Sequence, residues 1–574
     1  MKRIDVLGIT LAVVMAGCAP ATPGTGRPAQ SPSEGAPTTA SRTLVMAGRA
    51  EPVQLGVRIV PDSTGVSINA SRVLFNGVLA LLDDRGVPSP QLAESLPQLN
   101  SDSWQVFSDG RMETTYRLKP NLTWHDGTPL SALDFVFAWR AMISPEVGMG
   151  TTPPFQYMEE LSAPDDRTLV IRWRQPFPEA GALGDGRVRE LFALPRHVLE
   201  GPFETQRDVF TSLPFWNTAY VGLGPFRLDR WEQGAFIEAT AFDGYAWGRP
   251  RIDRIRMVFI GDANTALANL LSGDAHVTLD DVIRFQQGAI LQREWGPTNG
   301  GSVLLIPDQW RRTEIQQRAD YASPKALLDV RVRRALAHTV DRQALNDALF
   351  EGGGLMADSP LSPAADYYPL VDRALVKYPY DPRQADLIMA EAGLARGSDG
   401  FYASPSDGHL TWDLRVNTGP QAETEMAIMA ANWRQLGFDF RETVVPAAQS
   451  RDVQARATFP TLFSGGGSVG DAVLPDFISR LAPTAENRWV GTNRGGFSNP
   501  EYDRLIEQFS TTLDRSQRGQ LVADAMRVFT SDVAMISLYH NPGVVAFTAA
   551  LKGPILTSPE TSRVWNVHQW EFRG

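Results

Sequence analysis

The chain has 574 residues, 43% of them hydrophobic and 21% charged, and a formal net charge of −11 at pH 7. This acidic balance argues against nucleic-acid binding, which usually requires a basic surface. Cys18 is the only cysteine, so no disulfide bond within the chain stabilises the fold. A chain of this length exceeds what one hydrophobic core normally serves, and we expect two or three lobes.

The first 17 residues have the proportions of a secretory signal peptide. Lys2 and Arg3 precede an apolar run of 12 residues, from Val6 to Gly17, whereas a membrane-spanning helix needs about 20. The sequence Met15-Ala16-Gly17-Cys18 resembles a bacterial lipobox, although the usual leucine is absent at Met15. We therefore expect Cys18 to become a lipidated N-terminus, and two acyl chains hold a protein stably at a membrane. The alternative is a core cysteine that follows an ordinary signal peptide.

Residues 19–42 differ in composition from the rest of the chain. Pro, Ala, Gly, Ser and Thr dominate this segment of 24 residues, and large apolar side chains are absent. Such a segment buries too little surface to offset its ordering entropy. We interpret it as a flexible tether with a reach on the order of 25–30 Å. The alternative is a segment that docks on the globular body.

The remaining chain indicates a mixed α/β protein. A turn is predicted at Asp126-Gly127, followed by a helix capped near Ser131. A second helix is predicted to begin at Asp381-Pro382 and to end before Gly393.

Three more helices and a strand follow. One helix ends at Gly437, the strand runs over 438–445, the next helix begins at Asn499-Pro500, and the last covers the 522–529 region. Apolar residues at helical spacing are expected to form the core. These are Ala385, Ile388, Met389 and Ala392; Met426, Met429, Ala430 and Trp433; Tyr502, Leu505, Ile506 and Phe509; and Val522, Ala525, Met526 and Phe529.

Motifs for catalysis or metal binding are scarce. No two of the seven histidines lie within five residues of each other, and no Walker loop or zinc motif occurs. The cluster from Gly465 to Gly470 matches GxGxxG, and Gly466 to Gly470 matches GxSxG with Ser468 as nucleophile. However, residues 488–492 offer no acid for a dinucleotide site, and nothing selects His540 or His568 as a base. We interpret the cluster as a turn, and expect no enzyme activity, no cofactor and no resident metal; a secreted hydrolase is the alternative.

Six motifs occur in one order along the chain. The most distinctive is Trp124-His125-Asp126-Gly127 with Pro129, Ala132 and Asp134. The others are Gly222–Phe226, Ala241–Ile260, Asn264–Asp274, Asp329–Arg342 and Asn499–Asp503. Together they resemble the peptide/nickel-type (family 5) extracellular solute-binding proteins of ABC importers, from Thr43 to the end. We expect the segment around His125 to be architectural rather than a metal or ligand site.

The resemblance implies the α/β fold of type II (class C) periplasmic binding proteins, in which two main lobes are joined by a two-segment hinge and carry an inserted lobe. Lobe I would comprise residues 43–81, 218–304 and 536–574, lobe II residues 82–217, and lobe III residues 305–535. It further implies a monomeric lipoprotein that binds peptide between lobes and passes it to an ABC permease and ATPase complex. An extracellular peptide-signal receptor or chaperone, or a binder of oligosaccharide, opine or chelated metal, remains the alternative.

In peptide-binding relatives, an aspartate in a D-x-x-D-P segment accepts the peptide's ammonium group. Residues 470–477 align with this segment and place Asp471 at the anchor. Leu474 replaces the second aspartate, and Ser468 replaces the usual aromatic residue. The alternative for Asp471 is a loop acid or a helix N-cap. The run that contains Gly466, Gly467 and Ser468 could let the backbone approach a ligand closely, or it could be a simple turn. In the family, residues after the first strand line the cleft, which points to Arg49 and Glu51. The order of the segments suggests contacts from Trp489 and Tyr539.

Overall fold

The computed structural model describes residues 43–56, 59, 68–186, 189–279, 282–405 and 408–573. Cys18, the expected signal peptide and the expected tether lie outside these residues. Among the described residues, no helix is both long enough and apolar enough to cross a membrane.

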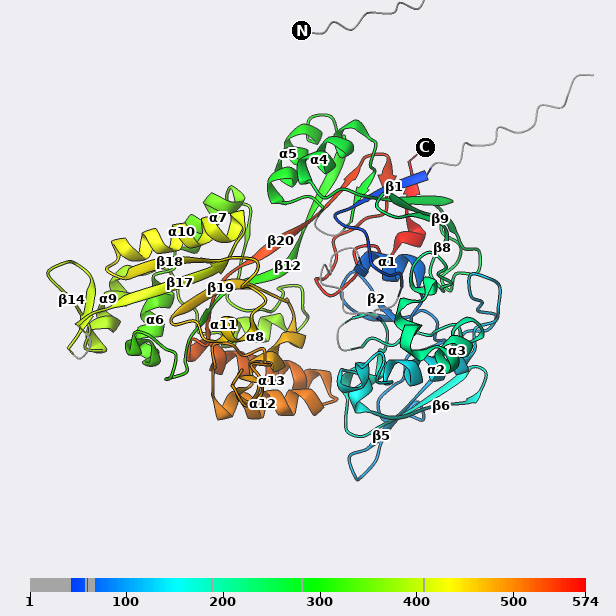
Figure 1. The fold of residues 1–574 in the computed structure, drawn as a ribbon, viewed down its shortest axis with the longest axis horizontal. Helices are drawn as coiled ribbons and strands as arrows, with labels where there is room; N and C mark the ends of the chain where they lie inside the picture. Colours follow the sequence, from blue (N-terminus) through cyan, green and yellow to red (C-terminus); the bar gives the residue numbers. More distant parts are fainter. Residues whose placement is uncertain are drawn as a thin grey trace, which may run out of the picture. The chain divides into compact units, whose positions relative to one another are not determined.

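One sheet of 11 strands dominates the structure (Figure 1). Its order is β18-β17-β19-β12-β20-β11-β1-β10-β9-β8, and β13 pairs with β20. The strands are β1 (Thr43–Gly48), β8 (Phe226–Glu232), β9 (Phe236–Ala241), β10 (Arg254–Phe259), β11 (Val277–Thr278), β12 (Gly301–Ile315), β13 (Leu355–Met356), β17 (Thr411–Asn417), β18 (Asp439–Val445), β19 (Leu462–Gly467) and β20 (Met535–Thr548).

Strands β12 and β20 lie side by side in antiparallel register and connect the two ends of this sheet (Figure 1). Pro307 lies opposite Pro542, and the register shifts between Pro307 and Gln309. Proline has no N–H to donate to a strand ladder. The hydrogen-bond ladder between β12 and β20 is therefore weakened where Pro307 and Pro542 face each other.

A separate four-stranded sheet has the order β4-β5-β7-β6. Its strands are β4 (Trp104–Val106), β5 (Met112–Arg117), β6 (Met158–Asp165) and β7 (Thr168–Trp173), with α2 (Ala132–Met142) packing on β6 and β7 and α3 (Arg196–Thr205) packing on α2. The helix cap predicted near Ser131 is present and takes the form of a capping box, because the Ser131 hydroxyl accepts from Leu133 N–H and Asp134 accepts from Ser131 N–H. Gly127 has φ of +88°, as the predicted turn requires.

His125 is buried in this region and has an architectural role. Its Nε2 lies 3.0 Å from the Gly224 carbonyl oxygen, and Gly222 N–H donates to its Nδ1 at 3.2 Å. A carbonyl can only accept and an amide N–H can only donate, so these contacts require the neutral imidazole with its proton on Nε2. Burial lowers the pKa of His125 to about 4, which agrees with this assignment.

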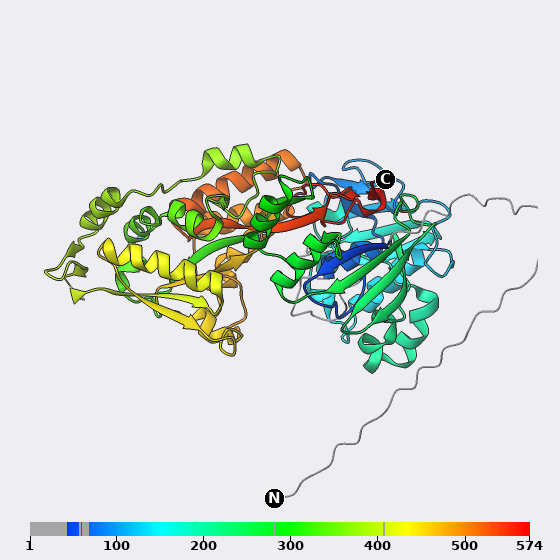
Figure 2. The same cartoon turned by 90° about the horizontal axis from the view of Figure 1, so that it is seen from above.

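The remaining helices cover the faces of the sheets. They are α1 (Ile68–Phe75), α4 (Ala263–Ser272), α5 (Phe285–Trp295), α6 (Val330–His338), α7 (Arg342–Phe350), α8 (Tyr368–Ala374), α9 (Pro382–Glu391), α10 (Pro420–Gln435), α11 (Val453–Ala457), α12 (Pro500–Thr511) and α13 (Arg515–Ser531). Small separate sheets are formed by β2 (Ala80–Leu82) with β3 (Pro88–Pro90), by β14 (Ala395–Arg396), β15 (Tyr402–Ser404) and β16 (Gly408–His409), and by β21 (Leu551–Lys552) with β22 (Glu571–Phe572). Figure 2 shows α10 lying along β17 and β18.

The predicted helix ends are confirmed. Asp381 accepts from the first-turn amides of α9, and Asn499 does the same for α12. Gly393 and Gly437 both have positive φ, at +79° and +84°. The apolar stripes of α12 and α13 are buried together in one apolar cluster, and that of α10 is buried in another, where the stripe of α9 is buried or half-buried.

The prediction of a turn over the glycine cluster is wrong for its first half. Gly465, Gly466 and Gly467 belong to β19 and pair with β12. A Cβ on Gly466 would lie 2.2 Å from the Gln309 side chain, and one on Gly467 would lie 1.9 Å from Nη1 of Arg312. These glycines therefore make room for side chains of the neighbouring strand, where the sequence pattern had suggested chain reversal.

Candidate functional site

A cavity of about 860 Å³ is the candidate functional site. Its walls come from the β2–β3 turn, residues 96–99, the 3₁₀ turn Pro178–Gly181, the residues before α8, residues 469–471, α13 and residues 556–560. This volume lies within the usual range of about 300–1,000 Å³ for small-molecule sites. Seven segments from different parts of the chain thus converge on one space.

Asp471 lies on the wall of this cavity at the start of the 3₁₀ helix Asp471–Phe477. Val473, Leu474 and Phe477 anchor that helix in a buried apolar cluster, and the Tyr502 hydroxyl donates to the Leu474 carbonyl at 2.8 Å. Tyr367 is hydrogen-bonded to the Asp471 carboxylate. Burial raises the pKa of Asp471, although the charge of Arg518 and this hydrogen bond oppose the effect.

Glu560 also lines the cavity, although no sequence pattern had pointed to this residue. Its loop is tied to the β2–β3 turn, because Ser558 N–H donates to the Asp84 carbonyl and the Thr561 hydroxyl donates to the Asp83 carbonyl, both at 2.7 Å. Burial raises the pKa of Glu560 to about 7, with Asp471 as the next largest cause. The Glu560 side chain is 37% exposed, but its exposed surface faces the cavity. We therefore attribute the raised pKa to the protein walls that surround this space.

Two arginines divide their contacts between Glu179 and Glu560. Arg189 lies 3.5 Å from Glu179 and 3.7 Å from Glu560, and Arg518 lies 3.2 Å from Glu179. A further pair, Arg515 with Asp366 at 2.8 Å, also lines the cavity. Glu179 is therefore matched by two guanidinium groups, whereas Glu560 has one distant partner.

Apolar side chains also line the cavity, beside these charged groups. These are Leu96, Leu99, Trp104, Val469, Leu513 and Val522. A cavity with an apolar wall and a few convergent charged groups is typical of a binding site for an organic solute that carries charge at one end.

Of the eight ligand contacts predicted from the sequence, all of which the structure describes, Asp471 alone lines this cavity. Gly466 and Gly467 belong to β19, and Ser468 is exposed just after it. Val469 and Gly470, the next residues, do line the cavity. The role of the glycines and of Ser468 in ligand binding stays a prediction.

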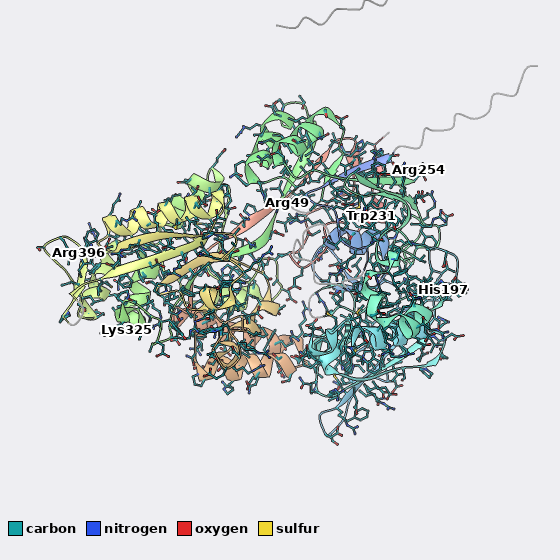
Figure 3. The ribbon with its side chains drawn as sticks, viewed as in Figure 1. Arg49, His197, Trp231, Arg254, Lys325 and Arg396 are labelled. Atoms are coloured by element: carbon teal, nitrogen blue, oxygen red, sulfur yellow. The ribbon has the colours of Figure 1, made fainter. Side chains whose placement is uncertain are left out.

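Arg49, which Figure 3 labels, comes directly after β1, and Glu51 follows two residues later. Arg49 is exposed, and the carboxylate of Glu51 accepts from Trp231 Nε1 at 2.5 Å and from Gly234 N–H at 3.0 Å. Glu51 therefore fixes the β8–β9 hairpin turn, a structural use that its position in the sequence did not suggest.

Trp489 and Tyr539 also lie away from the cavity wall. Trp489 has φ of +63° and packs against Tyr321, with 6.1 Å between ring centroids. Tyr539 is 3% exposed and donates its hydroxyl hydrogen to Glu425 at 2.5 Å. Burial and the neighbouring Glu425 carboxylate raise the pKa of Tyr539. The ring contact of Trp489 and the hydrogen bond of Tyr539 account for the positions of these side chains, and their predicted ligand contacts stay predictions.

No group of three or more His, Cys, Asp or Glu side chains is arranged to hold a metal ion anywhere in the described part of the chain. The cavity itself contains no histidine. Its chemistry is that of carboxylates, guanidinium groups, one phenol and apolar carbon.

Comparison with known proteins identifies the family. Residues 87–486 match the model of the bacterial extracellular solute-binding proteins, family 5 (middle). The chain belongs to this family. Its relatives are solute-binding proteins of ABC importers that bind peptides or related solutes, and they are not enzymes. Family 5 proteins are extracellular or periplasmic.

Individual members of the family carry different ligands. Heme-binding protein A of Haemophilus influenzae is 24% identical over 563 residues, which cover 94% of each chain. The structure of the oligopeptide-binding protein AppA from Bacillus subtilis with a nonapeptide matches with a TM-score of 0.67 at 21% identity, over 93% of this chain and 99% of that one. NikZ of Campylobacter jejuni with Ni(L-His) matches with a TM-score of 0.70 at 19% identity, over 92% and 99%. These structural matches establish the type II periplasmic-binding-protein fold for this family 5 member.

Proposed function

We propose that the protein is the substrate-binding lipoprotein of an ABC importer, that it captures peptides by their ammonium end, and that it delivers them to the permease. The observation that carries this proposal is Asp471, which lies on the wall of an 860 Å³ cavity. Among the described residues, Asp471 has no cationic partner within 4.0 Å. A carboxylate in such surroundings favours a cationic ligand, because a bound ammonium supplies the missing charge and hydrogen bonds.

The delivery step would use the two-segment hinge. We place the two crossings between lobes I and III at the level of Pro307 and Pro542, close to the boundary at residues 304–305 and a few residues beyond the one at 535–536. The interrupted ladder supports this placement, since a strand pair bends most easily where its hydrogen bonds are missing. Lobe II would comprise residues 82–217, which include the separate four-stranded sheet.

The membrane anchor would be the lipid on Cys18. It would keep the protein, as a monomer, on the periplasmic side or the outer face of the cytoplasmic membrane, close to its permease and ATPase complex. Mass spectrometry of the protein isolated from its own cells tests this step. Unmodified Cys18 at the N-terminus, or a mature chain that begins downstream, would contradict the lipoprotein assignment.

Peptide capture is tested with a synthetic pool of random peptides of two to nine residues and an N-acetylated copy of the pool. Native mass spectrometry should show the wild-type protein bound to free-amine peptides and not to their acetylated counterparts. Asp471→Ala should weaken binding by about 3–5 kcal/mol, or two to four orders of magnitude in Kd, because the ammonium then remains buried without a partner.

Asp476→Ala is the matched control, since Asp476 lies in the same 3₁₀ helix and does not line the cavity. The screen also includes haem, glutathione and Ni(L-His), which occur in the names of relatives. If the wild-type protein binds one of these and no peptide, the peptide assignment is wrong.

A further inference from the structure

Glu560 is held against the residue that precedes Asp471. A Cβ placed on Gly470 would lie 2.5 Å from Oε1 of Glu560, so the glycine leaves room for this carboxylate. The loop that carries Glu560 cannot easily turn away, because Ser558 and Thr561 on either side are bonded to residues of the β2–β3 turn. Two carboxylates from distant parts of the chain therefore lie next to each other at the cavity wall.

The charges around this pair do not balance. The ionisable groups that act on Asp471 or Glu560 are Glu179, Arg189, Arg515, Arg518 and Tyr367. Arg515 is paired with Asp366 at 2.8 Å. Arg518 and Arg189 both contact Glu179, and Arg189 reaches Glu560 only at 3.7 Å. With every group ionised, the three carboxylates Glu179, Asp471 and Glu560 exceed the two arginines by one negative charge.

We infer that Glu560 is a second cation-binding residue, that the ligand's ammonium group binds between Asp471 and Glu560, and that its binding displaces a proton held by this pair. The inference rests on the proposed function and names the group that recognises the ligand's charged end. One ammonium cation removes the excess negative charge of the cluster. The ammonium group also has three N–H donors. Two carboxylates can accept more of these hydrogen bonds than a single aspartate can.

The displaced proton follows from the free state of the pair. Without a cation, the adjacent carboxylates disfavour full ionisation, and the pKa of Glu560 is raised to about 7 by burial and by Asp471. A bound ammonium favours the ionised form of both. At pH 6.0, below the raised pKa of Glu560, the pair would therefore release most of one proton per ligand, while a free peptide amine, with a pKa of about 7.7–8.0, enters already protonated.

Titration calorimetry measures this release. The probe is the tightest-binding peptide recovered from the random pool, titrated at pH 6.0 into the full-length protein in two buffers of different ionisation enthalpy. The wild-type protein should release close to one proton, and the affinity should rise from pH 5.5 to pH 7. Glu560→Gln should release less than half as much and bind about ten- to hundredfold more weakly.

Glu571→Gln is the control, because Glu571 belongs to the same C-terminal segment, bonds Arg251 and Lys552, and does not line the cavity. It should behave as wild type. Glu560→Asp, which keeps the charge on a shorter side chain, should release a proton and bind between wild type and Glu560→Gln. Glu560→Asp replaces Glu560→Gln as the test variant if the latter has a Tm far below that of the wild-type protein.

The outcomes separate this inference from the proposed function. If no free-amine peptide binds the wild-type protein, the proposed function fails. If peptides bind and Asp471→Ala abolishes binding, but Glu560→Gln keeps the wild-type affinity and proton release, the role of Glu560 is wrong and the proposed function stands.

Discussion

Replacing Gly470 with alanine would test the geometry of the cavity wall directly. Gly470 has φ of +111° and ψ of 174°, a conformation that residues with a side chain rarely adopt. Its N–H donates to the Pro360 carbonyl at 2.9 Å, which fixes the backbone there. The new methyl group would lie 2.5 Å from Oε1 of Glu560. The substitution therefore acts on both backbone conformation and the second carboxylate.

The two effects differ in magnitude and in the quantity they change. Holding a non-glycine residue in this region costs about 1–3 kcal/mol. The steric conflict adds little to that, because the opposing atom is the free end of a glutamate side chain. We thus expect the strain to lower the free energy of unfolding by about 1–3 kcal/mol. If the region from 305 to 535 unfolds as a unit, Tm falls by about 2–12 °C.

Ligand affinity should fall because the new methyl group displaces the Glu560 carboxylate. A carboxylate pushed from the cavity wall no longer shares the ammonium with Asp471, so Gly470→Ala should approach the affinity of Glu560→Gln. In Gly470→Ala/Glu560→Ala the stability losses should add, whereas the affinity losses should not, because Glu560 is already absent. Calorimetry and thermal melts of the four proteins measure both quantities.

Gly465→Ala is the matched control, since a Cβ at Gly465 meets no atom within 4 Å and its φ is not positive. It should change neither Tm nor affinity appreciably. A Gly470→Ala protein with wild-type Tm and wild-type affinity would refute both the strain and the placement of Glu560.

Two further predictions concern stability. Glu425 is fully buried and accepts from Arg311 at 3.1 and 2.9 Å and from the hydroxyls of Ser464 and Tyr539, both at 2.5 Å. Glu425→Leu should cost about 3–5 kcal/mol by leaving Arg311 unpaired, and adding Arg311→Met should recover most of it; equal melting of the two variants would contradict this. For His125, the pKa is lower in the folded protein, about 4, than its ordinary 6.5. The unfolded chain thus binds more protons between these values, and up to about 3 kcal/mol of stability is lost as the pH falls from 6.5 to 4. Urea midpoints across this range should fall less steeply for His125→Gln, and parallel profiles would exclude His125 as the cause.

Local signals in the sequence predicted local structure well. Asp381, Asn499 and Ser131 cap helices because a short polar side chain satisfies the free first-turn amides wherever the helix lies in the fold. Gly393 and Gly437 end helices for a similarly local reason, the positive φ that glycine adopts without strain. The buried faces of the helices were predictable from the helical spacing of apolar residues alone.

Features set by distant partners were not predictable in the same way. Gly466 and Gly467 are glycines because Gln309 and Arg312 of the neighbouring strand occupy the space of a side chain, and nothing near them in sequence indicates that. Glu51 and Tyr539 are each hydrogen-bonded to a partner far along the chain, which no local pattern indicates, and their predicted ligand contacts stay predictions. Glu560 escaped notice because its neighbour Asp471 belongs to another segment.

The incomplete motif around Asp471 has a physical explanation in the fold. Leu474 stands at the second aspartate of the D-x-x-D-P segment that residues 470–477 resemble, and it is fully buried in the apolar cluster that anchors the 3₁₀ helix. A carboxylate at that position would have to leave the core to reach the cavity. Glu560 brings a second carboxylate to the same wall from the C-terminal segment without disturbing that core. In our proposal, cation recognition at this site depends on where the charges lie in space, so a motif within one segment contains only one of the two carboxylates.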